Sequence, residues 1–258
     1  MKIKNEQQGI IIPSSRLGTY KVPNEIIIKA PDIKGDDDEI PNILFKPPFR
    51  CVIVAPSNSG KSVLISNLIS SRDLPYRKYF KKNIFIWSST FHLTDPSFEM
   101  SDNIEKGNVY DEYNENTVME IVNEQIEIIK KYTKKKAPHL LFIFDDIIND
   151  LPMSRQNVMN KLFFSARHYN ISLILLSQQY KMVSRPVRLN ASDVIIFQTG
   201  NNSEVQKIAE EQAIPADKFK QILKDATSEP FSFLVIHNKL PIKDRYQLRL
   251  SNHIYNIN

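Results

Sequence analysis

The sequence predicts an α/β fold with a mostly parallel central sheet that is covered by helices on both faces. Two observations support this prediction. From residue 49 onward, short apolar runs alternate with amphipathic segments, which is the pattern of parallel strands joined by helical crossovers. The first apolar run leads into a loop of small residues that closes on Gly60, Lys61 and Ser62, directly before a helical segment. That order is the signature of a phosphate-binding loop.

The individual elements follow from apolar runs for strands and from 3.6-residue periodicity for helices. We expect strands at residues 51–54, 84–88, 140–144, 172–176 and 194–197. Helices are expected at residues 61–71, 117–132, 155–169, 204–211 and 216–226. Two closing strands should follow at 231–237 and 245–250, joined by 238–244. Residues 1–48, with one strand at 25–29, are expected to form an N-terminal extension, and residues 49–258 a P-loop ATPase domain.

Composition narrows the class of protein. The chain has 258 residues, of which 41% are hydrophobic and 24% charged, as in a soluble globular protein. No stretch approaches the roughly 18 consecutive apolar residues of a membrane span, and no signal-peptide core is present near Met1. The single cysteine, Cys51, excludes an internal disulfide and a cysteine-based zinc site. A reducing, cytosol-like compartment is expected.

Basic residues are unevenly distributed along a chain of net charge +5. No acidic residue occurs from 151 to 192, whereas basic residues occur at Arg155, Lys161, Arg167, Lys181, Arg185 and Arg188. Such a stretch could face nucleic acid or nucleotide phosphates, or it could be a solvated face. Two more basic segments, residues 72–82 with interleaved aromatics and 134–136, could contact DNA or could be exposed helix ends.

The phosphate-binding loop is the strongest single motif. Its backbone would cradle phosphates through Pro56, Ser57, Asn58, Ser59, Gly60, Lys61 and Ser62. Lys61 would reach the β- and γ-phosphates, and the Ser62 hydroxyl would bind Mg²⁺. Ala55 stands where the pattern has glycine, and alanine disfavours a positive φ.

Two further strands end in polar residues. Asp145 follows an apolar strand and would hold Mg²⁺ through its water shell, and Asp146 would polarise the attacking water. The alternative is a helix cap after a buried strand. The strand at 172–176 leads to Gln178 and Gln179. If that strand lies between the other two, Gln178 could contact both the γ-phosphate and the water; otherwise the pair is an exposed turn.

A longer stretch resembles a known family. The run FFSARHYNISLILLSQQYKMVSRPVRLNA contains Ala166-Arg167-His168 before Asn170-Ile171-Ser172, a strand ending in Gln178, and Pro186-x-Arg188-x-Asn190-Ala191. Together with the phosphate loop and the acid pair, it resembles the genome-packaging ATPases of nucleo-cytoplasmic large DNA viruses and virophages, in the FtsK–HerA superfamily. The resemblance spans residues 49–238. The sequence departs from the family pattern at two places. Ala55 stands in the phosphate loop, and the acid pair at the end of its strand is Asp-Asp where the family has Asp-Glu.

This resemblance implies a RecA-like fold, ATP and Mg²⁺ as cofactors, and a homo-oligomeric ring that drives double-stranded DNA into a capsid without sequence preference. It further implies a capsid or portal-vertex protein as partner, and a location in the host cytoplasm at the viral factory, with the virion as a second location. Arg188 or Arg167 would be the arginine that reads a nucleotide of the same or a neighbouring subunit. We expect Arg188, in a proline-punctuated loop, to reach the neighbour's γ-phosphate.

Two other functions are compatible with a phosphate loop. A P-loop kinase of nucleotides or small molecules would need an arginine-rich lid over its acceptor, and the glutamine-tipped strand favours hydrolysis instead. A nucleotide-gated assembly scaffold would bind capsid or membrane proteins and turn over slowly. Phosphate release, phosphate transfer and turnover with duplex DNA distinguish these three functions.

Overall fold

The computed structural model describes residues 12–14, 18–20, 40–88, 104–149, 151 and 156–256. The strand expected at 25–29 and the side chain of Arg155 lie outside these residues. The chain divides into two compact units, Met1–Gly35 and Asp36–Asn258. In the first unit, β1 (Ile12–Ser14) pairs antiparallel with β2 (Gly18–Tyr20). The second unit begins before the predicted boundary at residue 49, because Ile40, Leu44 and Phe45 are buried in its core.

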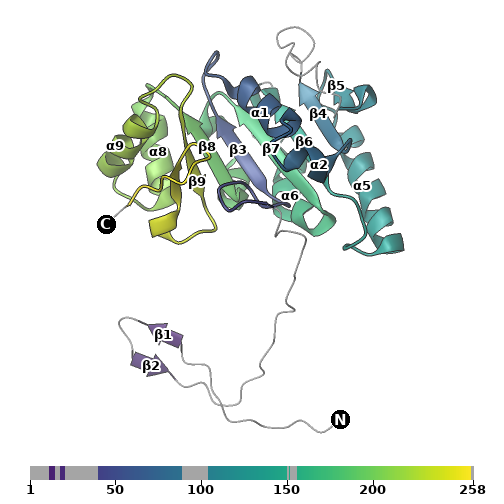
Figure 1. Cartoon of the computed structure of the whole chain (residues 1–258), viewed down its shortest axis with the longest axis horizontal. Coiled ribbons are helices and arrows are strands. Elements are labelled where there is room, and N and C mark those ends of the chain that lie inside the picture. Colours follow the sequence, from purple (N-terminus) through teal and green to yellow (C-terminus); the bar gives the residue numbers. More distant parts are fainter. Residues whose placement is uncertain are drawn as a thin grey trace. The chain divides into compact units, whose positions relative to one another are not determined.

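The second unit is built on one eight-stranded sheet in the order β10-β9-β8-β3-β7-β6-β4-β5 (Figure 1). All pairs from β8 to β5 are parallel, and only β9 and β10 are antiparallel to their neighbours. The strands are β3 (Arg50–Val54), β4 (Ile84–Ser88), β5 (Val109–Tyr110), β6 (Leu140–Asp145), β7 (Ile171–Ser177), β8 (Asp193–Phe197), β9 (Phe233–His237) and β10 (Tyr246–Leu248).

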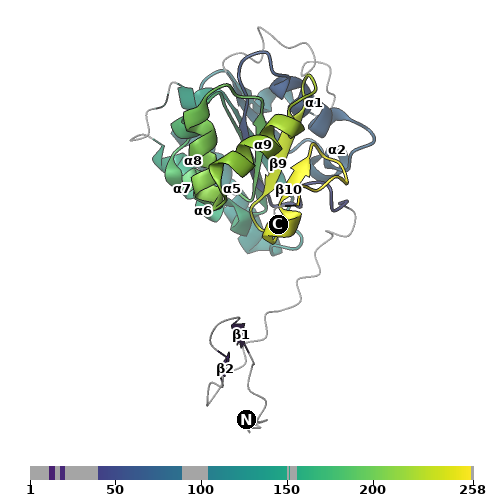
Figure 2. The same ribbon diagram turned by 90° about the vertical axis from the view of Figure 1, so that its left-hand side faces the viewer.

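Helices cover both faces of this sheet, because successive side chains of each strand point to opposite faces. On one face, apolar residues of the strands pack against α5 (Glu115–Tyr132), α6 (Asn157–Ser165), α7 (Arg185–Asn190), α8 (Asn202–Gln212) and α9 (Ala216–Ala226). On the other face they pack against α1 (Lys61–Ser70), α2 (Tyr76–Phe80) and residues 40–49. Figure 2 shows the two layers on either side of the sheet. The predicted fold class is confirmed.

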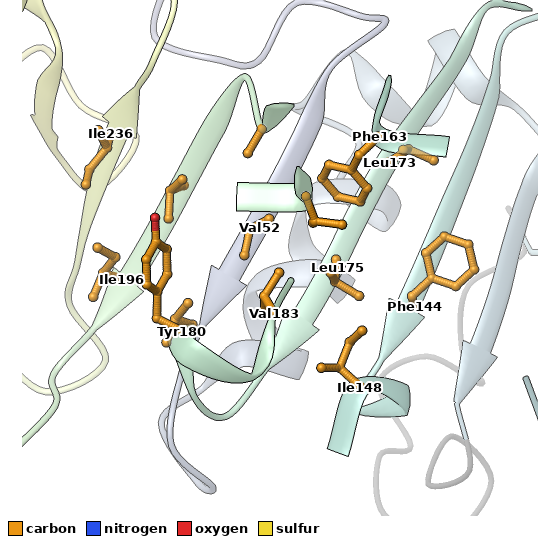
Figure 3. Packing of buried hydrophobic residues seen from close by; sticks show 14 of the residues in the cluster. Val52, Phe144, Ile148, Phe163, Leu173, Leu175, Tyr180, Val183, Ile196 and Ile236 are labelled. Atoms are coloured by element: carbon orange, nitrogen blue, oxygen red, sulfur yellow. The ribbon is translucent and has the colours of Figure 1, made fainter. Parts of the chain in front are cut away.

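The larger core layer consists of buried aliphatic and aromatic side chains. Val52, Leu175 and Phe144 lie on neighbouring strands in the same core layer as Val183 and Phe163 of α6, and Phe163 lies near Leu173 (Figure 3). Burying one such side chain contributes about 1.5–3 kcal/mol relative to exposure. The packing fixes the strands, and with them the residues that follow their carboxyl ends.

The structure differs from the sequence prediction mainly in short elements. Helices α2 and α7 and strand β5 were not among the expected elements, because each spans at most six residues and is too short to show a period. The helix predicted over 155–169 is α6 followed by a 3-10 turn, Ala166–Tyr169. None of the helices in the described ranges is both long and apolar enough to cross a membrane.

Candidate active site

The loop between β3 and α1 has the backbone of a phosphate-binding loop. Gly60 caps α1 at φ +92, and Asn58 also has a positive φ of +61. Ala55, the departure from the glycine pattern, is buried, and it is absent from the residues of positive φ. Its N–H donates to the Ser177 carbonyl at 3.0 Å, which extends the β3–β7 pairing by one residue. Alanine is therefore tolerated because this position stays in extended backbone.

Strand order brings the acid pair to the same edge as this loop. β7 lies between β3 and β6, and parallel pairing sets Val54 opposite Ser177 and Ser88 opposite Asp145. The carboxyl ends of the strands thus meet beside the N-terminus of α1, whose first N–H groups have no acceptor within the helix. Gln178 was expected to have a role only if its strand lies between the strands of the phosphate-binding loop and the acid pair. β7 lies between β3 and β6, so this condition is met.

Three predicted residues converge at this edge. The Lys61 ammonium contacts Oδ2 of Asp146, and Gln178 Nε2 donates to the same oxygen at 3.4 Å. Asp146 has φ +54, a left-handed conformation that aspartate tolerates better than most residues, and this turn directs its carboxylate to Lys61. Its second oxygen, Oδ1, is buried and has no hydrogen-bond partner within the described part of the chain. The arrangement holds one carboxylate between a cation and an amide.

Asp145 has a partner that the sequence analysis missed. Ser88 at the end of β4 donates its hydroxyl to Asp145 Oδ2 at 3.0 Å, and this fixes the carboxylate at the sheet edge. The Ser-Ser pair that ends the predicted strand 84–88 was the signal in the sequence. Among the described residues, no cluster of three or more His, Cys, Asp or Glu side chains could hold a metal. The oxygen donors of Ser62 and Asp145 suit Mg²⁺, which keeps several waters and takes few protein ligands.

Gln178 lies on a loop that is hydrogen-bonded to a residue of α8. The buried carboxylate of Glu204 accepts hydrogen bonds from the backbone N–H of Tyr180 at 2.5 Å and of Lys181 at 3.2 Å. The Ser177 hydroxyl donates to the Gln179 carbonyl at 2.8 Å. These contacts position Gln178 toward Asp146. Periodicity placed Glu204 on a helix and gave no hint of this role.

Arg188 is placed differently from its prediction. It lies in helix α7, not in a loop, and only 6% of it is exposed. Its Nε and Nη2 bind both oxygens of Glu211 at 2.7–3.3 Å, its Nη1 donates to the Val183 carbonyl, and its guanidinium lies 5.0 Å from the Tyr180 ring centre. These partners raise the pKa of Arg188 although burial opposes the charge. Arg188 is thus buried and paired within its own subunit, and it is not presented to a neighbouring nucleotide as the prediction required.

Arg167 is exposed and lies at the opposite edge of the sheet, in the 3-10 turn before β7. Lys134 donates its ammonium to the Arg167 carbonyl at 3.0 Å. The acid-free stretch from 151 to 192 therefore does not form one basic face. Arg167 lies at the amino edge of the sheet, Lys181 and Arg185 follow the carboxyl end of β7, and Arg188 is buried.

Comparison with known proteins places the chain in a family. A family model described as Poxvirus A32 protein matches residues 40–247. The chain belongs to this family. The DNA packaging proteins OPG160 of Variola virus and of Vaccinia virus (strain Western Reserve) are each 29% identical to it over 154 residues, which are 60% of this chain and 54% of each relative. The chain thus spans about half the length of these relatives. The predicted resemblance to viral packaging ATPases is confirmed at the level of family.

Solved structures support the fold of this Poxvirus A32 family member. The genome packaging NTPase B204 from Sulfolobus turreted icosahedral virus 2, in complex with ATP-gammaS, aligns with a TM-score of 0.54 and 20% identity over 80% of this chain and 98% of B204. The same protein in complex with AMP aligns with a TM-score of 0.56 and 20% identity, over the same shares of both chains. EssC (ATPases 2 and 3) from Geobacillus thermodenitrificans aligns with a TM-score of 0.53 and 10% identity, over 81% of this chain and 40% of EssC.

Proposed function

We propose that this chain is an ATP-hydrolysing motor that translocates double-stranded DNA into a viral capsid. The observation that carries the proposal is the convergence of Lys61, Asp146 and Gln178 beside the phosphate-binding loop, at the edge where Asp145 ends β6. Membership in a family whose relatives are named DNA packaging proteins supports the assignment to genome packaging.

The proposed nucleotide site uses the loop from Pro56 to Ser62. Its N–H groups and the N-terminus of α1 would bind the phosphates of ATP, and Lys61 would neutralise the β- and γ-phosphates. Ser62 and Asp145 would hold Mg²⁺, which neutralises charge on the phosphates when bound. The phosphates would compete with Asp146 for Lys61, and this competition would release the carboxylate to accept a proton from water.

Asp146 is the proposed general base, and Gln178 is proposed to orient the water. Both side chains converge on one point, since Gln178 Nε2 already contacts Asp146 Oδ2 at 3.4 Å. Asp146 Oδ1 is buried without a hydrogen-bond partner within the described chain, so it could accept a hydrogen bond from that water. A glutamine that orients water favours hydrolysis over phosphate transfer.

Arg167 replaces Arg188 as the proposed arginine finger. The seven residues of β7 separate Arg167 from the phosphate-loop edge by roughly 20 Å, at about 3.3 Å per residue. Arg167 therefore cannot reach the γ-phosphate of its own subunit, and it could act only on the nucleotide of a neighbour in a ring. Among the described residues, Arg167 forms no salt bridge with a carboxylate, so no salt bridge would have to break before it binds a nucleotide.

Duplex DNA is proposed to contact the amino edge of the sheet. Arg72, Lys78 and Lys81 around α2, with Lys135 and Lys136 after α5, are exposed at this edge. A groove of about 560 Å³ there is lined by Arg72, Lys78, Tyr79 and His139, among others. α2 buries Tyr76 and Phe80 and leaves its basic side chains at the surface, where phosphates can reach them. A capsid or portal-vertex partner and a role in assembly inside the infected cell are further parts of the proposal.

The test is ATP hydrolysis by the purified chain with and without duplex DNA. We expect DNA of any sequence to stimulate turnover, and binding to weaken steeply with salt. Lys135→Gln with Lys136→Gln should reduce the slope of log K against log salt by about 0.9 for each lost phosphate contact. Lys220→Gln with Lys224→Gln, two exposed lysines of α9, is the matched control. Phosphate transfer to a nucleoside, or turnover indifferent to DNA, would contradict the motor.

A further inference from the structure

An exposed aromatic residue stands beside the phosphate-binding loop. Phe231 lies in the turn that joins α9 to β9, and 69% of it is exposed. Phe233, two residues later, packs in the core layer that contains α1, and its ring centre lies 5.2 Å from that of Phe197. The turn with Phe231 follows the same side of the sheet to the carboxyl edge, where the loop before α1 lies.

Phe231 touches this loop at its glycine. A Cβ added to Gly60 would lie 3.0 Å from Phe231 Cδ1 and 3.6 Å from Phe231 Cβ and Cγ. A Cβ at this position would press on the ring of Phe231, and the φ of +92 is a conformation that favours glycine. The ring of Phe231 therefore lies against the phosphate-binding loop at Gly60.

The chain holds Phe231 in an unfavourable conformation. Its φ is +59, which is rare for a bulky side chain, and its ring gains little from burial. The turn is fixed on the following residue: the Ser232 hydroxyl donates to the Ala226 carbonyl at 2.6 Å, and Arg249 Nε donates to the Ser232 hydroxyl at 2.8 Å. Strained backbone that the surroundings hold in place is typical of ligand clamps.

The strand order indicates which part of a bound nucleotide Phe231 would contact. Asp146 and Gln178, the residues proposed to act at the γ-phosphate, lie on the β7 and β6 side of the phosphate-binding loop. A triphosphate bound with its γ end there must leave the loop on the other side, toward β8 and β9. The turn before β9 is where Phe231 stands.

We propose that Phe231 is a base-stacking residue of this nucleotide site, and that its ring packs on the face of the purine base of the bound nucleoside triphosphate. The inference rests on the proposed function, because it assumes that a nucleotide binds the loop. Every base has a π-face, so stacking gives affinity without selecting one base. Adenine and guanine nucleotides should therefore depend on Phe231 to the same degree.

The experiment distinguishes the contribution of the base to binding from that of the phosphates. Calorimetric titrations of ATPγS, GTPγS and inorganic tripolyphosphate, each with Mg²⁺, would be compared between the wild-type chain, Phe231→Ala, Phe231→Tyr and Phe164→Ala. Phe164, on α6, is 68% exposed and is the matched control for loss of an exposed ring. We expect Phe231→Ala to weaken both nucleotides about tenfold, in the range of base–aromatic stacking, and to leave tripolyphosphate binding unchanged. Phe231→Tyr and Phe164→Ala should bind all three ligands like the wild type.

Two results would overturn the inference. Unchanged nucleotide binding by Phe231→Ala would show that the ring does not contact the base. Equal weakening of nucleotide and tripolyphosphate would show that the ring only shapes the phosphate-binding loop. A wild-type chain that binds neither nucleotide would overturn the proposed function itself, and the inference with it.

Discussion

Lys61 and Asp146 contact each other directly, although the proposed chemistry assigns them to different partners. Their side chains are mostly buried, with 11% and 20% exposure. In the proposed mechanism, phosphates draw Lys61 away from Asp146, and the freed carboxylate then faces the attacking water. Nucleotide binding and water activation would thus be coupled through this one contact.

Asp146→Asn is predicted to separate binding from hydrolysis. The amide keeps the size of the side chain but cannot accept the proton of the attacking water. We expect ATP affinity close to that of the wild type and turnover lower by about 10²–10⁴-fold. Titration calorimetry and phosphate release measure the two quantities.

Lys61→Ala is the companion variant, and it should lose turnover because it removes the charge that follows the phosphates into the transition state. Wild-type hydrolysis by Asp146→Asn would remove this residue from the catalytic role and leave Asp145 as the acid to test.

At the scale of elements, Arg188 joins α7 to α8. The bidentate pair with Glu211 is almost inaccessible, and Glu211 also accepts a hydrogen bond from the Tyr180 hydroxyl at 2.7 Å. Burial opposes ionisation of Glu211, but the hydrogen bonds from Arg188 and Tyr180 outweigh it and lower the pKa of this carboxyl. The pair therefore contributes stability above the ordinary pKa near 4.5, and this stability is lost as pH falls through the lowered value.

Arg188→Ala is predicted to destabilise the fold by about 3–5 kcal/mol, because it leaves the buried Glu211 charge without its partner. Arg185→Ala, an exposed arginine of the same helix, is the control and should change stability little. Chemical denaturation measures both. A folded Arg188→Ala protein of normal stability that binds ATP but does not hydrolyse it would return Arg188 to the role of arginine finger.

His237 joins the three strands at one side of the sheet. It ends β9, its Nδ1 lies 2.7 Å from Asp193 Oδ1 on β8, and its Nε2 lies 2.7 Å from Gln247 Oε1 on β10. Both ring nitrogens face acceptor oxygens, so the imidazolium can donate to both. Burial lowers the pKa of His237, but the bond and charge of Asp193 outweigh burial and raise it above 6.5.

The stability of the fold should therefore depend on His237 in one pH window. With a raised folded pKa, the contribution is fully present below about pH 6.5 and is lost as pH rises through the folded value. We expect the difference in Tm between the wild type and Asp193→Asn to be largest below about pH 6.5 and to shrink as pH rises through the raised pKa of His237. His253→Asn, which removes an exposed histidine, is the control. A difference in Tm that does not change with pH would contradict a charged His237.

At the scale of the whole molecule, the two edges of the parallel sheet carry different sets of charged residues. The carboxyl edge holds the phosphate-binding loop, Asp145 and Asp146, whereas the amino edge holds Arg167 and the exposed lysines at 135 and 136. A ring in which the amino edge of one subunit approaches the carboxyl edge of the next would complete each nucleotide site with Arg167. One such guanidinium is worth about 10³-fold or more in rate in phosphoryl transfer.

Mixing of inactive subunits is predicted to restore activity. Arg167→Ala subunits should bind ATP but not hydrolyse it, and Lys61→Ala subunits lack the phosphate-loop lysine. In a mixed ring, a Lys61→Ala neighbour supplies Arg167 to an intact phosphate-binding loop, so some turnover should return. Turnover of the wild type per subunit should also rise with protein concentration. Full activity of Arg167→Ala alone, or activity independent of concentration, would exclude the shared site.

The sequence by itself determined the elements whose signal is local. A buried parallel strand must be apolar throughout, and a phosphate-binding loop must follow it with Gly60, Lys61 and Ser62 before a helix, so both could be predicted from short windows. The same holds for Asp145 and Asp146, because an acid at the end of such a strand reaches the edge where the loop lies. The predicted strands of the parallel sheet are confirmed for this reason.

Only the tertiary structure decided what depends on contacts between distant residues. Arg188 was expected to be free, but Glu211 lies 23 residues further along the chain and binds it only after α7 and α8 pack. Ser88 reaches Asp145 through strand pairing, and Phe231 reaches Gly60 across the fold. The basic stretch from 151 to 192 could have faced phosphates or solvent as one surface, yet β7 carries its residues to opposite edges of the sheet. Side-chain direction and strand order are properties of the packed chain, and no local pattern encodes them.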